Sequence, residues 1–356
     1  MFPMKKKIIF LHNRLNKEDA LKRIAQEAFR RKTVSFYRYV RIEAPEKLRD
    51  QLFRQWSELG VLGRVYLARE GINAQISVPE PNWQIFEEKL NAVSEFSSVP
   101  FKMAVEEGLS FWKLKIKVRT QIVADGLRDD DYDVTDVGRH LTPQEFQTAL
   151  EKEDAIIVDM RNHYESRIGK FERAITPDAD TFREELPMVR EVLKGKEDKK
   201  ILLYCTGGIR CEKASAFLRH HGFEDVNQLY GGIIHYVHEM RQKKLPSRFI
   251  GKNFVFDERL GERITDDVLS SCDQCGQPCD AYTNCANMIC NRLFIQCEVC
   301  RKKNAHCCSS ACKNIASLPE DAQRTRRKGI KHTFSRYKAQ IRPGLQIPSG
   351  TISYRP

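Results

Sequence analysis

The residue best placed to do covalent chemistry is Cys205, which follows an apolar run and precedes two glycines. A loop of this kind at the start of a helix points successive backbone N–H groups inward, which suits an anion. A cysteine there is stabilised as the thiolate, the form that attacks electrophiles or carries sulfur. We therefore predict a catalytic pair, Cys205 with the positive charge of Arg210. The loop expected to surround the sulfur comprises Thr206, Gly207, Gly208 and Ile209.

Cys211, six residues further on, falls in the expected first turn of the next helix. It could resolve an oxidised or persulfidated Cys205 as a disulfide. It could equally be a small buried residue that packs the helix on the sheet. A phosphatase is disfavoured, because the related tyrosine-phosphatase loop needs one more residue between its cysteine and arginine than separates Cys205 from Arg210.

A second group of reactive side chains is the cysteine-rich segment, which holds ten of the twelve cysteines between residues 272 and 312. In a chain without an export signal such a cluster indicates metal ligands rather than disulfides. Two C-x2-C pairs match a structural zinc site and contribute Cys272, Cys275, Cys297 and Cys300. A second ion would draw on Cys279, Cys285, Cys290, Cys307, Cys308 and Cys312, with His306 as a further possible ligand. Zinc is favoured over an iron–sulfur cluster, because the tight cysteine runs of ferredoxins are absent.

The composition is that of a basic protein without a membrane segment. The net charge is +12, and the excess is concentrated in residues 1–32 and 324–342. Such basic arms favour polyanions, although the second could simply be a soluble disordered end. No apolar stretch is long enough for a membrane helix, and the apolar run before His12 is too short for a signal peptide. We expect a cytoplasmic protein.

These residues are positioned by two expected domains and a cysteine-rich module. Residues 33–123 predict an antiparallel ferredoxin-like sheet with both helices on one face and the other face open. The expected elements are strand 33–42, helix 48–59, a hairpin of strands 64–67 and 72–78, helix 83–93 and strand 111–123. From a capping box at Thr142, helices alternate with short apolar strands at 155–160 and 200–204, which predicts a parallel, doubly wound sheet. The predicted division is 1–32, 33–124, linker 125–141, 142–245, 246–316 and tail 317–356.

The open face of the first domain is a candidate RNA-binding surface. The last strand alternates apolar residues with cations, and we expect it to lie beside the first strand of the sheet. Aromatics and cations would then meet as they do on RNA-recognition sheets. The candidate residues are Tyr37, Tyr39, Arg41, Lys113, Lys115, Lys117 and Arg119. The alternative is an ordinary solvated sheet face.

Several motifs resemble known families. The run from Val158 to Glu165, the Cys205 loop and the segment Leu229-Tyr230-Gly231-Gly232-Ile233 resemble the signature of rhodanese domains. The order of a ferredoxin-like domain containing Ala68-Arg69-Glu70-Gly71-Ile72-Asn73, a rhodanese domain and a cysteine cluster resembles the rhodanese-domain tRNA uridine(34) hydroxylases, over roughly residues 33–315. This resemblance implies oxygen-dependent formation of 5-hydroxyuridine at the wobble position in the anticodon region of tRNA. It also places the active-site cysteine, a persulfide intermediate by analogy, at Cys205.

Two other functions stay open. The first is a sulfurtransferase acting on small molecules or persulfides, which the rhodanese core supports equally well. The second is a non-catalytic RNA-binding or redox-sensing module. The residues themselves show neither a flavin nor a nicotinamide motif, nor a two-histidine, one-carboxylate iron site. Molecular oxygen is therefore implied only by the resemblance.

Overall fold

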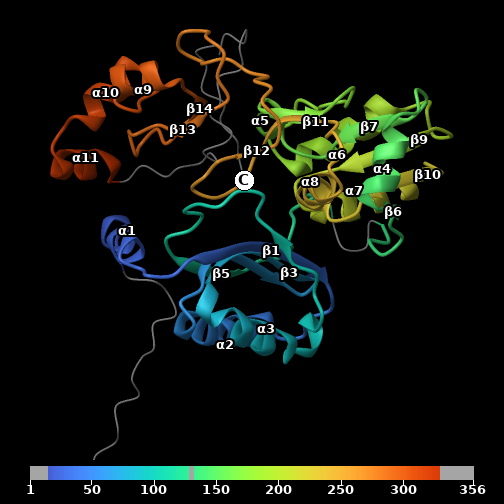
Figure 1. Cartoon of the computed structure of the whole chain (residues 1–356), viewed down its shortest axis with the longest axis horizontal. Helices are drawn as coiled ribbons and strands as arrows, with labels where there is room; N and C mark the ends of the chain where they lie inside the picture. Colours follow the sequence, from blue (N-terminus) through green and yellow to red (C-terminus); the bar gives the residue numbers. More distant parts are fainter. Residues whose placement is uncertain (1–14, 128–131, 329–356) are drawn as a thin grey trace, which may run out of the picture. The chain divides into compact units, whose positions relative to one another are not determined.

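The computed structural model describes residues 15–127 and 132–328 (Figure 1). They form two compact units, which meet in the sequence at Asp267 and Val268. Within the described part of the chain, every helix is too short or too polar to cross a lipid bilayer.

The first domain is a sheet covered on one face by two helices (Figure 1). Its elements are β1 (Arg31–Tyr39), α2 (Pro45–Glu58), β2 (Leu62–Ala68), β3 (Gly71–Pro79), α3 (Trp83–Asn91), β4 (Lys102–Met103) and β5 (Leu114–Val118). Alternate residues of β1, such as Val34 and Phe36, are buried in the core that α2 and α3 cover. Phe36 and Phe86 both pack edge-on against Trp56. The split βαβ pattern therefore follows the alternation predicted from the sequence.

We predicted that the first and last strands of this sheet lie side by side, and this prediction is wrong. The strand order is β4-β1-β3-β2-β5, and β5 pairs in parallel with β2. The place beside β1 is taken by the two-residue strand β4, through the pairs Val34–Met103 and Ser35–Lys102. The chain then crosses to the opposite edge of the sheet before it forms β5, so β3 and β2 separate the tyrosines of β1 from the lysines of β5.

A short helix precedes the first strand of the sheet. Helix α1 covers Lys17–Ala25, and Asn16 caps it by accepting a hydrogen bond from the Asp19 N–H. Strand β1 then begins at Arg31.

The rhodanese-type domain is a parallel sheet of order β6-β10-β9-β7, with helices on both faces. One face is covered by α4 and α8 and the other by α6 and α7. The Thr142–Glu145 capping box at the start of α4 is confirmed. The elements are β6 (Arg139–Leu141), α4 (Pro143–Leu150), β7 (Ile156–Asp159), α5 (His163–Ser166), β8 (Gly169–Phe171), α6 (Phe182–Leu193), β9 (Lys200–Tyr204), α7 (Ile209–His220), β10 (Asp225–Leu229) and α8 (Gly232–Lys243).

The segment that follows α8 folds with this domain. Strand β11 (Phe249–Asn253) pairs with β8 on one side and with β12 (Glu262–Arg263) on the other. We had assigned residues from 246 onward to the cysteine-rich module. The structure instead places the boundary between the compact units after Asp267.

The second unit contains little regular structure. It has a two-stranded hairpin of β13 (Tyr282–Asn284) and β14 (Leu293–Ile295), followed by α9 (Glu298–Lys303), α10 (Ser310–Ala316) and α11 (Glu320–Arg327). The predicted irregular tail from 317 is therefore helical at its start. The remainder of the proposed nucleic-acid arm, from residue 329, lies outside the described residues, as do residues 1–14 of the N-terminal arm.

Candidate active site

The Cys205 loop joins the end of β9 to the start of α7. Its geometry depends on Gly208, whose φ of +95° is unfavourable for any residue with a side chain. The Gly208 N–H donates a hydrogen bond to Cys205 Sγ at 3.1 Å. A Cβ at Gly208 would also lie only 2.9 Å from Tyr37 Oη, so the loop leaves no room for a larger residue there.

The thiol of Cys205 is an anion at neutral pH. It is fully buried, and burial alone would raise its pKa. That effect is outweighed by the hydrogen bond from the Cys211 thiol, by the charge of Arg210, and by the N–H groups of Arg210 and Cys211, which together lower the pKa to about 5. Burial and the neighbouring Cys205 anion raise the pKa of Cys211 well above its ordinary value, so Cys211 keeps its proton and donates it.

Arg210 is held by a carboxylate that the sequence analysis did not single out. Its guanidinium forms a bidentate pair with Glu165, with nitrogen–oxygen distances of 2.5 and 2.9 Å. Glu165 is fully buried, and its Oε1 also accepts a hydrogen bond from the Asn162 N–H at the start of α5. Its place three residues after Asn162 is a capping-box signal that could have marked this role. Arg210 is therefore fixed beside the sulfur.

Asp159 and Arg161 form a second buried ion pair near the loop. Both side chains are fully buried and form two hydrogen bonds, of 2.8 and 2.7 Å. Arg161 also donates to the Gly169 carbonyl, and Tyr204 Oη donates to Asp159. The pair fixes the ends of β7 and β9, directly before the Cys205 loop.

The first domain contacts the start of α7 through the two tyrosines predicted to lie on an open surface. Tyr37 Oη donates to Glu212 at 2.8 Å, and Tyr39 Oη donates to the Ile209 carbonyl at 3.3 Å. Glu212 also accepts from Gln228 and lies 3.0 Å from His140 Nε2. This part of the sheet is consequently not open, because it faces the Cys205 loop.

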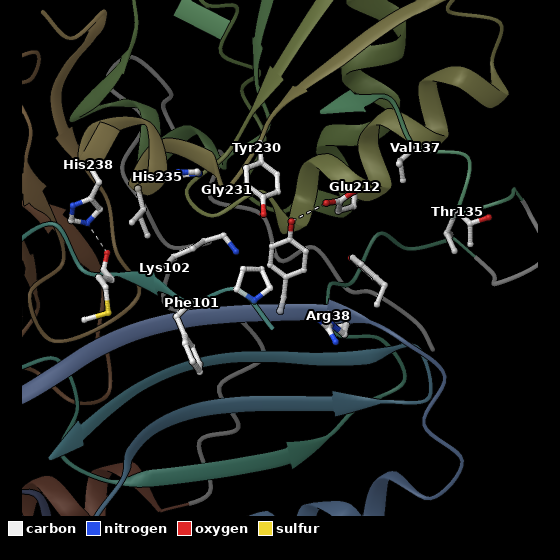
Figure 2. Close-up of a pocket in the computed structure, with 16 residues that line it drawn as sticks. Arg38, Phe101, Lys102, Thr135, Val137, Glu212, Tyr230, Gly231, His235 and His238 are labelled. Atoms are coloured by element: carbon white, nitrogen blue, oxygen red, sulfur yellow. Dashed lines mark hydrogen bonds between the residues drawn. The ribbon is translucent and has the colours of Figure 1, made fainter. Parts of the chain in front are cut away.

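A cavity of about 680 Å³ lies between these two surfaces (Figure 2). Lys102 reaches into it from β4, with its ammonium 4.3 Å from the centre of the Tyr37 ring. Burial lowers the pKa of Lys102 to about 8, although the negative charges of Cys205 and Glu212 oppose that shift. Lys102 also lies beside the Cys205 loop, because a Cβ at Gly207 would be 3.7 Å from Lys102 Cδ.

The predicted cations of the first domain form a strip away from this cavity. In the register of the sheet, Lys115 lies opposite Arg64 and Lys117 opposite Tyr66. Burial lowers the pKa of Lys115, and the neighbouring cations lower it further. Lys113 and Arg119 complete this cationic strip, which we define as Arg64, Lys113, Lys115, Lys117 and Arg119. Within residues 15–127 and 132–328, none of the five forms a salt bridge.

Arg41 does not belong to the cationic strip. It follows the end of β1, is exposed, and pairs with Glu43 at 2.7 Å. Strand β1 ends at Tyr39, so its alternation does not extend to Arg41, which we predicted on the same face as Tyr37 and Tyr39.

The cysteine-rich unit brings eight thiols together in two groups. The members are Cys272, Cys275, Cys297 and Cys300 in the first group, and Cys285, Cys290, Cys308 and Cys312 in the second. Sulfurs of Cys275 and Cys297, and of Cys290 and Cys308, are 3.7 Å apart. Four sulfurs bound to zinc at ~2.3 Å would be separated by about 3.8 Å in a tetrahedron, so both groups fit that ion. Cys279, Cys307 and His306 belong to neither group.

Three regions of the chain match known families. Residues 31–122 match the UPF0176 acylphosphatase-like domain, residues 142–239 the rhodanese-like domain, and residues 250–313 the rhodanase C-terminal family. A protein of Leptospira interrogans named tRNA uridine(34) hydroxylase is 55% identical over 94% of this chain and 92% of its own length. Proteins of the same name from Cronobacter sakazakii and Salmonella arizonae are 49% and 48% identical, over 95% and 96% of this chain and 98% and 99% of their own.

Proposed function

Because the chain belongs to the tRNA uridine(34) hydroxylase family, we propose that it converts the wobble uridine of tRNA to 5-hydroxyuridine through Cys205. The observation that carries the proposal is the Cys205 thiolate, whose loop lies beside Lys102, a residue that lines a cavity large enough for a nucleoside. The other wall of that cavity comes from the domain that carries the cationic strip. The proposed substrate, tRNA, is cytoplasmic, and we propose that the protein acts in the cytoplasm.

The residues around the sulfur keep it ionised and fixed in position. Gly208 and Cys211 donate hydrogen bonds to it, while Arg210 supplies a positive charge that Glu165 prevents from moving. In the product, a C–OH bond replaces the C–H bond at C5 of the uracil ring, and molecular oxygen is the proposed co-substrate. One oxygen atom enters that bond and the other leaves as water, with two electrons and two protons supplied by a dithiol reductant that becomes a disulfide. Cys205 supplies the nucleophilic sulfur of the site. A role for Cys211 as a resolving thiol is compatible with its hydrogen bond to Cys205.

We assign tRNA backbone binding to the cationic strip. Burial and the neighbouring cations lower the pKa of Lys113 and Lys115, and an RNA phosphate chain would relieve the repulsion between these charges. Tyr37 and Tyr39 lie on the same sheet but at the cavity, so we assign them to the active-site end of the bound RNA. The anticodon region is the part of tRNA that must reach this end.

We infer one structural zinc ion for each group of four cysteines. Such an ion would cross-link a unit that has little apolar core of its own.

Transfer of sulfane sulfur is the second candidate activity. It is favoured by the rhodanese-like match over residues 142–239 and by the same low-pKa thiolate. It makes no use of the cationic strip, which is why tRNA hydroxylation is preferred.

Mass spectrometry of nucleosides from tRNA tests the proposed function. Cells that lack the gene should lose 5-hydroxyuridine at position 34, and the wild-type gene should restore it. Cys205→Ser should not restore it, whereas Cys279→Ser, a cysteine outside both the loop and the metal groups, should. Full restoration by Cys205→Ser would exclude this residue as the reaction centre.

A further inference from the structure

The cavity beside the Cys205 loop has an exposed aromatic side chain at its rim. Tyr230 follows β10 and is 44% exposed, which is unusual for a large ring. Its ring lies 5.5 Å from that of His235 and 6.2 Å from that of His140, both edge-on. Figure 2 shows Tyr230 extending from the rhodanese-type domain toward the space that Lys102 enters from the first domain. Tyr230 therefore presents accessible aromatic surface at the rim of the cavity.

The same cavity holds a cation without an anionic partner. Lys102 is half-buried, and in the described part of the chain its ammonium forms no salt bridge and donates no hydrogen bond. An ammonium inside a cavity, without a hydrogen-bond acceptor from the protein, can donate to a ligand that brings one. A carbonyl oxygen or an anion would satisfy it.

The carboxylate in the cavity, that of Glu212, already has hydrogen-bond partners from the protein. Glu212 accepts from Tyr37 and Gln228 and lies within hydrogen-bond distance of His140. It therefore holds Tyr37 in place and does not occupy the Lys102 ammonium, which stays free to donate to a ligand. A flat ligand with a carbonyl group near the Cys205 loop matches the ring and the donor together.

We propose that this cavity holds the base of a single uridine turned out of the anticodon loop, stacked on Tyr230 and accepting a hydrogen bond from Lys102 at O4. The proposal rests on the proposed function and identifies the part of the substrate that the site reads. O4 is the chosen acceptor because it is attached next to C5, the carbon to be hydroxylated, and Lys102 borders the loop that carries the reactive sulfur. Cytosine has an amino group in place of O4, and that donor would face the ammonium.

Binding of short RNA hairpins tests the proposal. The probes are anticodon stem-loops with uridine, cytidine or an abasic site at position 34, and fluorescence anisotropy gives the Kd of each. For the wild type, the abasic probe should bind roughly 5- to 150-fold more weakly than the uridine probe, the range expected for one lost base stack. Equal affinity for the uridine and abasic probes would overturn the proposal.

Variants assign the two contacts. Tyr230→Ala should bind uridine and abasic probes almost equally, whereas Tyr230→Phe, which keeps the ring, should behave as the wild type. Lys102→Met should lose the preference for uridine over cytidine, while the exposed Lys47→Met on α2 should keep it. A preference for uridine that survives in Lys102→Met would exclude Lys102 as the O4 donor. Because Tyr230 is exposed, we expect its variants to fold normally. The comparison of uridine and abasic probes with the wild type tests the proposal without any variant.

The nucleoside measurement separates this proposal from the proposed function. If the wild type forms 5-hydroxyuridine but does not distinguish the abasic probe, only the base-binding cavity is refuted. If it forms no 5-hydroxyuridine, the proposed function fails whatever the probes show.

Discussion

Lys213 Nζ lies 2.9 Å from Glu70 Oε2, an ion pair that joins the helix after the Cys205 loop to the β2–β3 turn of the first domain. Asp125 accepts from the same ammonium, also at 2.9 Å, and Lys213 is almost fully buried. Glu70 in turn accepts a hydrogen bond from the Ile122 N–H. This cluster fixes the sheet that carries Tyr37 against the helix that carries Glu212, so it sets the width of the cavity.

Lys213→Met should destabilise the first compact unit. The change leaves Asp125 buried and Glu70 half-buried without their cation, and removal of one partner from a buried ion pair costs about 3–5 kcal/mol. Urea denaturation should therefore show a fall of about 3 kcal/mol in the free energy of unfolding. Lys47→Met, an exposed substitution, should change it by less than about 0.5 kcal/mol. A Lys213→Met protein as stable as the wild type would show that the cluster makes no net contribution to the free energy of unfolding.

The thiolate of Cys205 should titrate in the acid range. Its pKa of about 5 means that the anion predominates at neutral pH and is lost as the pH falls through about 5. The difference in ultraviolet thiolate absorbance between wild type and Cys205→Ser isolates this one group among twelve cysteines. An absorbance step near the ordinary thiol pKa, and none in the acid range, would contradict the geometry of the loop.

Cys211→Ala should move that titration to higher pH, because it removes the strongest hydrogen bond to the anion. Cys211→Ser keeps a donor and should stay closer to the wild type. Comparison of these two variants also distinguishes the two possible roles of Cys211. If Cys211 resolves an oxidised Cys205, both variants should fail under oxidising conditions, whereas a pure hydrogen-bond role would spare Cys211→Ser.

Replacing Lys113, Lys115 and Lys117 with Glu should weaken tRNA binding steeply. Each lost phosphate contact lowers the slope of log affinity against log salt by roughly 0.7–0.9. Leu114 and Ile116 still supply the buried face of β5, so thermal stability should be retained. Unchanged tRNA affinity in this triple variant would exclude the cationic strip and direct attention to the basic arms. Thiosulfate turnover, measured on the same samples, should stay near that of the wild type.

Elemental analysis of purified protein should find about two zinc ions per chain. Cys275→Ser should reduce the content to about one, and so should Cys312→Ser, because each removes a thiolate from one group. Cys279→Ser should retain both ions, since its sulfur belongs to neither group. Protein without metal would contradict the assignment, and visible absorbance with iron would indicate an iron–sulfur cluster instead.

Two strands of the rhodanese-type domain could be predicted closely from its sequence. Strand β9 has the predicted limits 200–204, and β7 covers 156–159 of the predicted 155–160, because a short apolar strand is bounded by polar residues. The group of four cysteines around Cys272 and Cys300 was equally predictable, since its C-x2-C spacing reflects local ligand geometry.

Features that depend on contacts between distant segments could not be predicted in this way. Strand β4 has only two residues, too few for any periodicity, yet it displaces β5 from the edge beside β1. Lys102 lies on that strand, so its position beside the Cys205 loop was hidden as well. The buried environments of Tyr37 and Tyr39 come from the rhodanese-type domain, which the alternation within β1 cannot reveal.

Because β11 pairs with β8, the folded domain extends beyond the residues that match the rhodanese-like family. The rhodanese-like match ends at residue 239, but Phe249 of β11 is fully buried and packs on Phe171 of β8. A fragment cut at residue 245 would leave β8 with an unpaired edge and an uncovered aromatic ring, which is a template for aggregation. Anyone who wishes to study the Cys205 loop in isolation should therefore carry the fragment through Asp267.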